Sequence, residues 1–374
     1  MTFSIPYLTE LMDGMMAEDL ADCRIDAAAV SITLSGRNVL RRYYGAAQEG
    51  MIYRLASMTK PITAAAVLML AAQGKLKVDE PVSHYLPEYG ALRLGRIAAS
   101  GQPEDIGPCR IPLTIRHLLT HTGGLMCGPL GLAQYASFPA AAQANLAAAV
   151  AAYPQYLLSF EPGTQAAYSA VAGFDVLARI VEIVSQESYP QFLYRSLFHP
   201  LGMNDTVFAP NESQWARMAS MHVRVLGASG PQNEHDEMGR HVFESFPLSY
   251  PAGGAGLAGT LEDYERFALM LLNKGGGLLP KEAIHAMSMP QVPAGTPGLS
   301  PTESWGLGVR VTTSDPVLPP GSFGWSGAYG THFWVDPQHE LTCVYMKNSR
   351  YDGGSEAVTA RRTEQVVMKA VNQS

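Results

Sequence analysis

The sequence has few cysteines, few lysines and no run of like charges. Its formal net charge is −7, and no stripe of Lys and Arg offsets this acidity, so we expect no nucleic-acid partner. The four cysteines are widely spaced and form no C-x-x-C pair, which indicates neither a zinc site nor a disulfide framework. They are Cys23, Cys109, Cys127 and Cys343.

Long hydrophobic runs are also absent. No stretch is long enough to span a bilayer, and residues 1–20 lack the basic and apolar regions of a secretory signal. These absences predict a cytoplasmic protein without a membrane partner, although a mature chain that had lost a leader would look the same. Hydrophobic residues at 47% and charged residues at 16% are typical of an ordered globular protein, and 374 residues allow two domains.

The most informative stretch is residues 53–74. From Thr63 to Ala72 almost every residue is apolar and favours a helix, and Gly74 provides a stop signal. Pro61 fits the first turn of that helix, where its missing N–H leaves no hydrogen bond unmade. Ser57 should therefore lie at or just before the helix start, with Lys60 one turn further on the same face.

This S-x-x-K spacing predicts a nucleophile with its own base. A serine needs a neighbouring base to attack, and burial favours the unprotonated lysine that could act as one. The helix N-terminus adds N–H groups and a positive field where an oxyanion would develop. The alternative is that Ser57 is only an N-cap and Lys60 only a solvated side chain. Lysine is scarce, however, and Lys60 alone has a serine three residues before it, which favours the catalytic interpretation.

The rest of the chain predicts an α/β (α+β) fold. Two predicted strands come early, three come late, and a long helical block separates them, so the sheet should be assembled from both chain ends. We expect a sheet domain of residues 1–81 and 290–374, a mainly helical domain of residues 82–289, and the active site between them. Helices are predicted over 3–22, 140–152, 174–184, 189–198, 261–273 and 356–371, strands over 27–34, 39–44, 306–311, 330–335 and 341–346, and loops over 97–110 and 209–250.

Three other patterns were weighed as functional sites. His117 and His121 are spaced to share a helix face, but a third metal ligand is missing and Leu118 occupies the glutamate position of H-E-x-x-H. The glycine-rich segment 253–256 lacks the G-K-[ST] ending of a phosphate loop. No G-x-S-x-G is present, which argues against a Ser-His-Asp hydrolase using His121 or His332. The sequence therefore predicts no metal and no cofactor.

Three motifs resemble those of the serine β-lactamase and penicillin-binding-protein superfamily. They are Ser57-Met58-Thr59-Lys60, Tyr168-Ser169-Ala170 and Trp325-Ser326-Gly327, with surroundings at 117–125, 200–203 and 253–260. Within that superfamily the chain looks most like the class C-related carboxylesterases of family VIII. The resemblance runs from about residue 25 to about residue 350 and implies a β-lactamase-like fold. S-x-x-K is its specific part, since the other two motifs are weak alone.

The resemblance also implies roles for these residues. Ser57 would form an acyl-enzyme, and Lys60 with Tyr168 would remove and return its proton; the alternative for Tyr168 is simple packing under the helix. The N–H groups of Ser57 and of Ala328, which follows the third motif on an edge strand, would form the oxyanion hole. The predicted substrate-binding residues are Met58, Met126, Trp325, Ser326 and Gly327.

Two departures from the class C pattern indicate the substrate. Ala170 replaces an asparagine, and Trp325-Ser326-Gly327 replaces Lys-Thr-Gly, so an apolar indole stands where a cation would hold a carboxylate. This change favours small uncharged esters over β-lactams and D-amino acid peptides, whose turnover would be weak. An acyltransferase would share every one of these residues. A non-catalytic binding or scaffolding member would not need Ser57, Lys60 and Tyr168. Neither the natural ester nor the oligomeric state can be predicted from these patterns.

Overall fold

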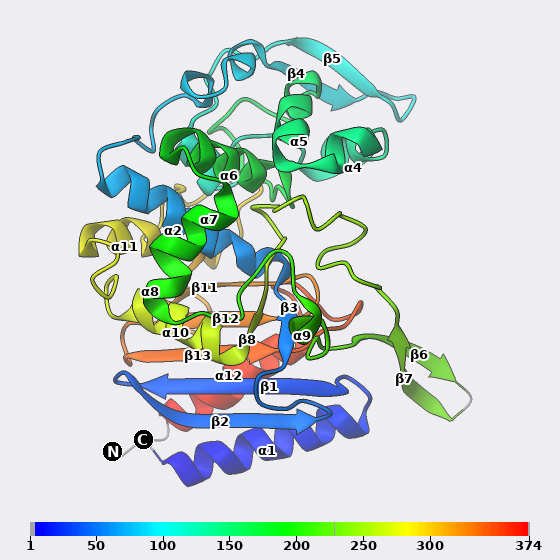
Figure 1. The fold of residues 1–374 in the computed structure, drawn as a ribbon, viewed down its shortest axis with the longest axis vertical. Coiled ribbons are helices and arrows are strands. Elements are labelled where there is room, and N and C mark those ends of the chain that lie inside the picture. Colours follow the sequence, from blue (N-terminus) through cyan, green and yellow to red (C-terminus); the bar gives the residue numbers. More distant parts are fainter. Residues whose placement is uncertain (1–3, 228, 373–374) are drawn as a thin grey trace.

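A seven-stranded antiparallel sheet forms one side of the protein (Figure 1). The structure is a computed structural model that describes residues 4–227 and 229–372. Strand β1 pairs with β2 and with β13, so the two chain ends lie side by side, as predicted. The order is β2-β1-β13-β12-β11-β10-β9. The strands are β1 (Ala27–Leu34), β2 (Arg37–Gly45), β9 (Glu303–Trp305), β10 (Arg310–Thr312), β11 (Phe323–Ser326), β12 (His332–Asp336) and β13 (Leu341–Met346).

Each face of the sheet is covered by helices because its strands alternate apolar side chains between two cores. On β12, Trp334 packs into a core with residues of α1 (Ile5–Ala21) and α12 (Val358–Asn372). Its neighbours Phe333 and Val335 point the other way, into the main core. There α10 (Leu261–Leu272) packs against β12 and β13, with the Tyr264 ring 4.9 Å from that of Phe333.

Helix α2 (Thr59–Ala72) is the most buried helix of the fold. Every residue from Thr59 to Leu70 is buried, so the helix has no solvent face. It packs against α6 (Ala172–Ser185), and Figure 1 shows α2 between α6 and the sheet. The remaining helices are α3 (Ile115–Leu119), α4 (Gly128–Tyr135), α5 (Leu146–Ala152), α7 (Tyr189–Leu193), α8 (His199–Leu201), α9 (Glu212–Trp215) and α11 (Lys281–Ser288).

Most predicted helices are present with shifted ends. The helix predicted over 3–22 is α1, and residue 3 lies outside the described part of the chain. The helix predicted over 140–152 is divided, because the Asn145 side chain accepts a hydrogen bond from the Ala148 N–H and starts a new helix there. The helix predicted over 189–198 is α7 followed by a π-helical turn over 194–198.

The loops predicted over 97–110 and 209–250 were wrong in part, because each overlaps a β-hairpin. The first is β4 (Arg93–Ile97) with β5 (Pro103–Pro108), and the second is β6 (Met221–Gly227) with β7 (Gly230–Asp236). Both hairpins are largely solvated, so their sequences lack the apolar alternation of half-buried strands. Polar cross-strand contacts replace it, such as the 2.7 Å ion pair between Arg96 and Glu104.

Strand β11, which carries the third motif, was not predicted. The strand expected over 306–311 is instead a turn followed by the start of β10, and β11 comes later, between β12 and β10. The third motif is therefore not on an edge strand, and that prediction was wrong. Because β10 pairs only with Phe323 and Gly324, however, Trp325 and Ser326 extend beyond it. Gly324 makes this stretch resemble a loop in the sequence. In the structure a glycine is needed there, because a Cβ would lie 2.0 Å from the Phe333 carbonyl oxygen.

A further two-stranded pairing ties the middle of the chain to the S-x-x-K segment. Strand β3 (Ile52–Arg54) pairs with β8 (Ala258–Thr260), which leads directly into α10. Since α10 comes from the middle segment yet packs on the sheet, the two parts of the chain interlock. The domain boundaries near residues 81 and 290, and a site between the domains, stay predictions.

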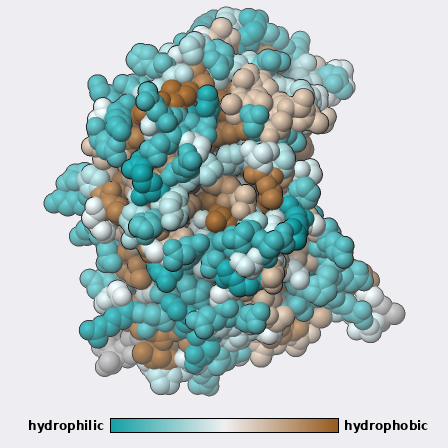
Figure 2. Space-filling model, in the orientation of Figure 1, coloured by the Kyte–Doolittle hydropathy of each residue, from teal (hydrophilic) through white to brown (hydrophobic). Residues whose placement is uncertain are grey.

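The surface of the protein is mainly polar on the side seen in Figure 2. Hydrophilic residues cover most of this face, and hydrophobic residues show in several places, among them a hollow near its centre and an area at the upper right. Among the helices of the described residues, none is both long and apolar enough to cross a membrane.

Candidate active site

Ser57 lies in a short turn that connects β3 to α2. Residues Ala56–Met58 form a single 3₁₀ turn, and α2 begins at Thr59, so Ser57 stands just before the helix as predicted. Ala56 has a φ of +46°, a left-handed conformation that costs on the order of 1 kcal/mol for a residue with a side chain. The turn is held from outside by Tyr264, whose hydroxyl donates to the Met58 carbonyl at 2.8 Å.

The Lys60 amine is buried beside Ser57. Its Nζ lies 3.2 Å from Ser57 Oγ, 2.5 Å from the Ala170 carbonyl oxygen and 2.8 Å from the Gly254 carbonyl oxygen. The side chain is only 1% exposed. Two backbone carbonyls and the serine hydroxyl are therefore the hydrogen-bond partners of the amine.

Tyr168 completes this group from a third segment of the chain. Its hydroxyl donates to Ser57 Oγ at 2.6 Å, and the Lys60 Nζ lies 4.8 Å from the centre of its ring. The Trp325 indole N–H donates to the same phenol oxygen at 3.4 Å. The structure thus brings the predicted Ser57, Lys60 and Tyr168 into mutual contact.

His121 holds Tyr168 in place, a role that the sequence did not indicate. The N–H groups on both sides of Tyr168 donate to this residue: Ala167 to its carbonyl oxygen at 2.9 Å and Ser169 to its Nδ1 at 3.1 Å. Complete burial, with the nearby Lys60 charge, lowers the pKa of His121 well below its ordinary value. The ring is therefore neutral and acts as an acceptor.

The two histidines considered as metal ligands do not share a helix face. Helix α3 ends at Leu119, and His121 has a left-handed φ of +54°. His117 instead closes a capping box, its Nδ1 accepting from the Thr114 N–H at 3.2 Å. Within residues 4–227 and 229–372, no three His, Cys, Asp or Glu side chains are grouped as metal ligands.

A buried carboxyl group supports the lysine from behind. Asp175 on α6 accepts hydrogen bonds from the hydroxyls of Tyr250 and, at 3.1 Å, Tyr153, and from the Gly254 N–H at 3.4 Å. The carbonyl of that same Gly254 accepts from Lys60. Burial raises the pKa of Asp175 to about 6, although the two tyrosine hydroxyls oppose the shift. The sequence signal for this role was the position of Asp175, an acidic residue between Phe174 and Val176 in an apolar helix.

A cavity of about 450 Å³ opens in front of Ser57. Aromatic rings form part of its wall: Trp305 and Trp325 have ring centres 4.7 Å apart, and both face Tyr168. Ser57 and Ala328, the predicted oxyanion-hole residues, lie on this same cavity. The other lining residues are Gly298, Leu299, Ser300, Glu303, Ser304, Arg310, Ser326 and Gly353 to Glu356.

Three predicted substrate-binding residues do not line this cavity, and a role for them in substrate binding stays a prediction. Met58 is fully buried in the main core, and Met126 is 2% exposed and packs in the same core. Gly327 contributes space rather than contact: a Cβ there would lie 2.1 Å from Thr331 Oγ1 and 2.4 Å from the Leu55 carbonyl oxygen. Its lack of a side chain lets β11 approach the turn that holds Ser57.

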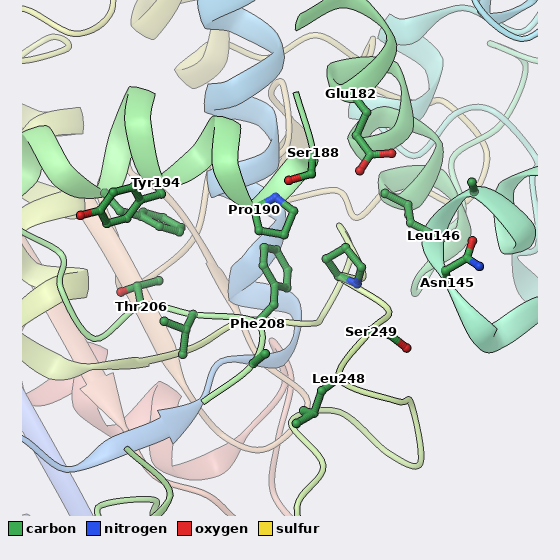
Figure 3. A pocket seen from close by; sticks show the side chains of 15 residues that line it. Asn145, Leu146, Glu182, Ser188, Pro190, Tyr194, Thr206, Phe208, Leu248 and Ser249 are labelled. Atoms are coloured by element: carbon green, nitrogen blue, oxygen red, sulfur yellow. The ribbon is translucent and has the colours of Figure 1, made fainter. Parts of the chain in front are cut away.

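A second cavity, of about 540 Å³, lies elsewhere and is lined by none of Ser57, Lys60 and Tyr168. Figure 3 shows Pro190 above Phe208 on its wall, with Leu146 and Leu248 further round. The serine that contacts both a lysine and a tyrosine lies at the smaller cavity, which is therefore the candidate active site.

We expect Asp175→Asn to change the pH dependence of stability. The folded protein holds the Asp175 proton up to about pH 6, whereas the unfolded chain releases it near pH 4, so wild-type stability should fall by about 3 kcal/mol as pH rises through this window. Asparagine cannot ionise, so the variant should gain stability relative to wild type over the same range. Urea unfolding at pH about 4 and about 7 measures this difference.

The control for this experiment is Asp105→Asn on the exposed β5, where a hydrogen bond from Arg93 lowers the carboxyl pKa. The difference in stability between Asp105→Asn and wild type should be almost the same at pH 4 and at pH 7. A stability difference between Asp175→Asn and wild type that is the same at both pH values would contradict the role of Asp175 burial.

Comparison with known proteins places this geometry in a family. The model of the Beta-lactamase family matches residues 10–368. Esterase EstB of Burkholderia gladioli is 30% identical over 389 aligned residues, covering 94% of this chain and 93% of EstB. Acyltransferase calJ of Penicillium decumbens is 28% identical, covering 77% of this chain and 73% of calJ.

Solved structures agree with these relatives. EstCE1, described as a hydrolase with promiscuous acyltransferase activity, superposes with a TM-score of 0.78 at 25% identity, covering 99% of this chain and all of EstCE1. The resemblance to the serine β-lactamase and penicillin-binding-protein superfamily is thereby confirmed, and the relatives support a serine hydrolase of the esterase or acyltransferase kind. Because the family model matches residues 10–368 and EstB is 30% identical over 94% of this chain, the chain belongs to the β-lactamase family.

Proposed function

We propose that the protein is a serine carboxylesterase of the family VIII type that hydrolyses small uncharged esters. The observation that carries the proposal is the contact of Ser57 Oγ with both the Lys60 amine, at 3.2 Å, and the Tyr168 hydroxyl, at 2.6 Å. These distances are within reach for proton transfer. The names of EstB and EstCE1, an esterase and a hydrolase, support the same reaction class.

In the proposed first step, Ser57 Oγ attacks the ester carbonyl carbon while its proton passes to the Lys60 amine. The N–H groups of Ser57 and Ala328 stabilise the oxyanion that forms, and one such donor is typically worth roughly 3–4 kcal/mol of the barrier. The bond to the alcohol oxygen then breaks, and that oxygen takes a proton from Tyr168, which is replenished from Lys60. An acyl group remains on Ser57.

In the proposed second step, water attacks the acyl-enzyme. Its proton passes to the Tyr168–Lys60 pair, and the departing Ser57 oxygen receives a proton from the same pair. The acid leaves and the starting arrangement is restored. The proposed transfers use only Ser57, Lys60, Tyr168, the substrate and water, so no metal or cofactor takes part in these steps.

The charges around the cavity support uncharged substrates. Of the described residues that line it, Arg310 is the one cation, and its guanidinium is bound to Glu303 at 3.0 Å and to Glu364 at 3.1 Å. Trp325 forms an apolar wall near Tyr168. A substrate carboxylate, such as that of a penicillin, would therefore enter the cavity without a free cationic partner.

Ser57→Ala should lower kcat for p-nitrophenyl butyrate on the order of 10⁴-fold or more, because it removes the nucleophile. A fluorophosphonate should add one equivalent of mass to the wild type at Ser57 and none to the variant. Ser322→Ala is the matched control: this serine is fully buried and its hydroxyl lacks a hydrogen-bond partner. Survival of most of the activity in Ser57→Ala would refute the esterase proposal, and an unreactive wild type would favour a non-catalytic scaffold.

Lys60→Ala and Tyr168→Phe should each lower kcat about 10²- to 10⁴-fold, since each removes part of the proton path. The double variant should lose much less than the product of the two single losses, because the two groups act as a unit. Steady-state kinetics of the three variants, with circular dichroism to confirm folding, measure this coupling. Fully multiplicative losses would show that the two side chains act independently.

Acyl transfer is a second candidate function, favoured by the names of calJ and EstCE1. An alcohol would replace water in the second step, with the same residues moving the proton. We expect hydrolysis to dominate, so that p-nitrophenol and butyric acid appear in equal amounts from p-nitrophenyl butyrate when a small alcohol is added. Product analysis by chromatography decides: butyrate ester formed in excess of butyric acid would identify a transferase.

A further inference from the structure

A chain of hydrogen bonds runs behind the third motif. Ser326 Oγ lies 2.8 Å from Nδ1 of His332, the residue opposite it on β12, and His332 Nε2 lies 3.1 Å from Glu364 Oε1 on α12. All three side chains are almost completely buried. Ser326 also lines the cavity that contains Ser57. The proposed mechanism does not use this chain.

Glu364 fixes the direction of these hydrogen bonds. Arg310 and Arg361 form ion pairs with its carboxylate at 3.1 and 2.6 Å, and these pairs favour the ionised form. An ionised carboxylate can only accept, so His332 Nε2 must donate to it. When the imidazole is uncharged, its other nitrogen, Nδ1, is an acceptor, and Ser326 donates its single hydroxyl proton to it.

The Ser326 oxygen consequently has only lone pairs left for a ligand. Its charged neighbours on the cavity wall are Glu303, Glu356 and Arg310, and both terminal nitrogens of Arg310 are already bound to Glu303 and Glu364. This wall therefore offers hydrogen-bond acceptors and negative charge. A ligand with an N–H or O–H group suits it, whereas a carboxylate meets repulsion.

The position of Tyr168 indicates which half of an ester meets this wall. In the proposed mechanism Tyr168 returns the proton to the leaving alcohol, so that oxygen must lie beside the phenol. The phenol contacts the Trp325 indole, and Ser326 is the next residue along β11. In this arrangement the leaving alcohol faces the part of the cavity wall to which Trp325 and Ser326 both belong.

We propose that Ser326, oriented by His332 and Glu364, is a specificity-determining hydrogen-bond acceptor that selects esters whose alcohol portion carries an O–H or N–H donor and rejects those that carry a carboxylate. This inference rests on the proposed function. It assigns His332 and Glu364 as positioning residues, since they act through the serine hydroxyl.

Three butyrate esters test this selectivity: those of 2-hydroxyethanol, 2-methoxyethanol and glycolic acid. All three give the same acyl-enzyme, so their kcat/KM values differ through the alcohol portion alone, by its recognition and by its reactivity as a leaving group. The intrinsic reactivity is the same for every variant, so the change of the ratio in Ser326→Ala reports recognition. We expect the hydroxyethyl ester to exceed the methoxyethyl ester by roughly threefold to tenfold, the range of one neutral hydrogen bond, and the glycolate ester to be the poorest. In Ser326→Ala the ratio of the first two should fall to about one, while Ser322→Ala should keep the wild-type ratio.

A wild-type ratio near one, or a ratio unchanged in Ser326→Ala, would overturn the inference. If Ser57→Ala is inactive while the wild-type ratio is near one, the selectivity fails and the esterase proposal stands; if Ser57→Ala stays active, the esterase proposal fails first. Nitrogen NMR of histidine-labelled protein at mildly alkaline pH tests the positioning. The signal absent from His332→Gln should show the proton on Nε2, and a proton on Nδ1 would overturn the assigned direction.

Discussion

The burial of the Lys60 amine is the constraint on which the rest of the site depends. An amine with almost no exposure must find its hydrogen-bond partners inside the protein, because leaving a donor unsatisfied there costs several kcal/mol if it is charged. The Ala170 and Gly254 carbonyls and the Ser57 hydroxyl supply those partners. Ala170 and Gly254 lie 110 and 194 residues from Lys60 along the chain, so the fold must bring both of them to the start of α2.

Several contacts hold the groups that surround the Lys60 amine. The segment of Gly253 and Gly254 lies directly against α6, where a Cβ on Gly253 would come within 2.3 Å of the Phe174 carbonyl oxygen. Asp175 binds the Gly254 N–H from the same helix and so orients the peptide that faces Lys60. On the other side, His121 holds the two peptides that flank Tyr168. These contacts fix carbonyls and a phenol, not the reacting serine itself.

The cavity in front of Ser57 differs in character from this buried polar group. One side is aromatic, formed by Trp305, Trp325 and Tyr168, and the other carries Glu303, Arg310 and Ser326. The aromatic side offers apolar contact area, which does not depend on the direction of a hydrogen bond. The polar side can discriminate between ligands through hydrogen bonds and charge. In the proposed mechanism the groups that move protons are separate from this polar side, so substrate preference could change without loss of the Ser57 environment.

The sequence by itself determined the S-x-x-K helix, the sheet built from both chain ends and the three motif residues now found in contact. These follow from local spacing and apolar periodicity, which a single chain displays directly. It did not indicate the two solvated hairpins or β11, because exposed strands lack apolar alternation and Gly324 resembles a loop residue. Tertiary structure alone decided the roles of His121, Asp175, His332 and Glu364. His121, Asp175 and Glu364 contact partners more than 30 residues away, and His332 meets Ser326 only because β11 and β12 pair. Such pairings depend on packing distances that sequence spacing does not encode.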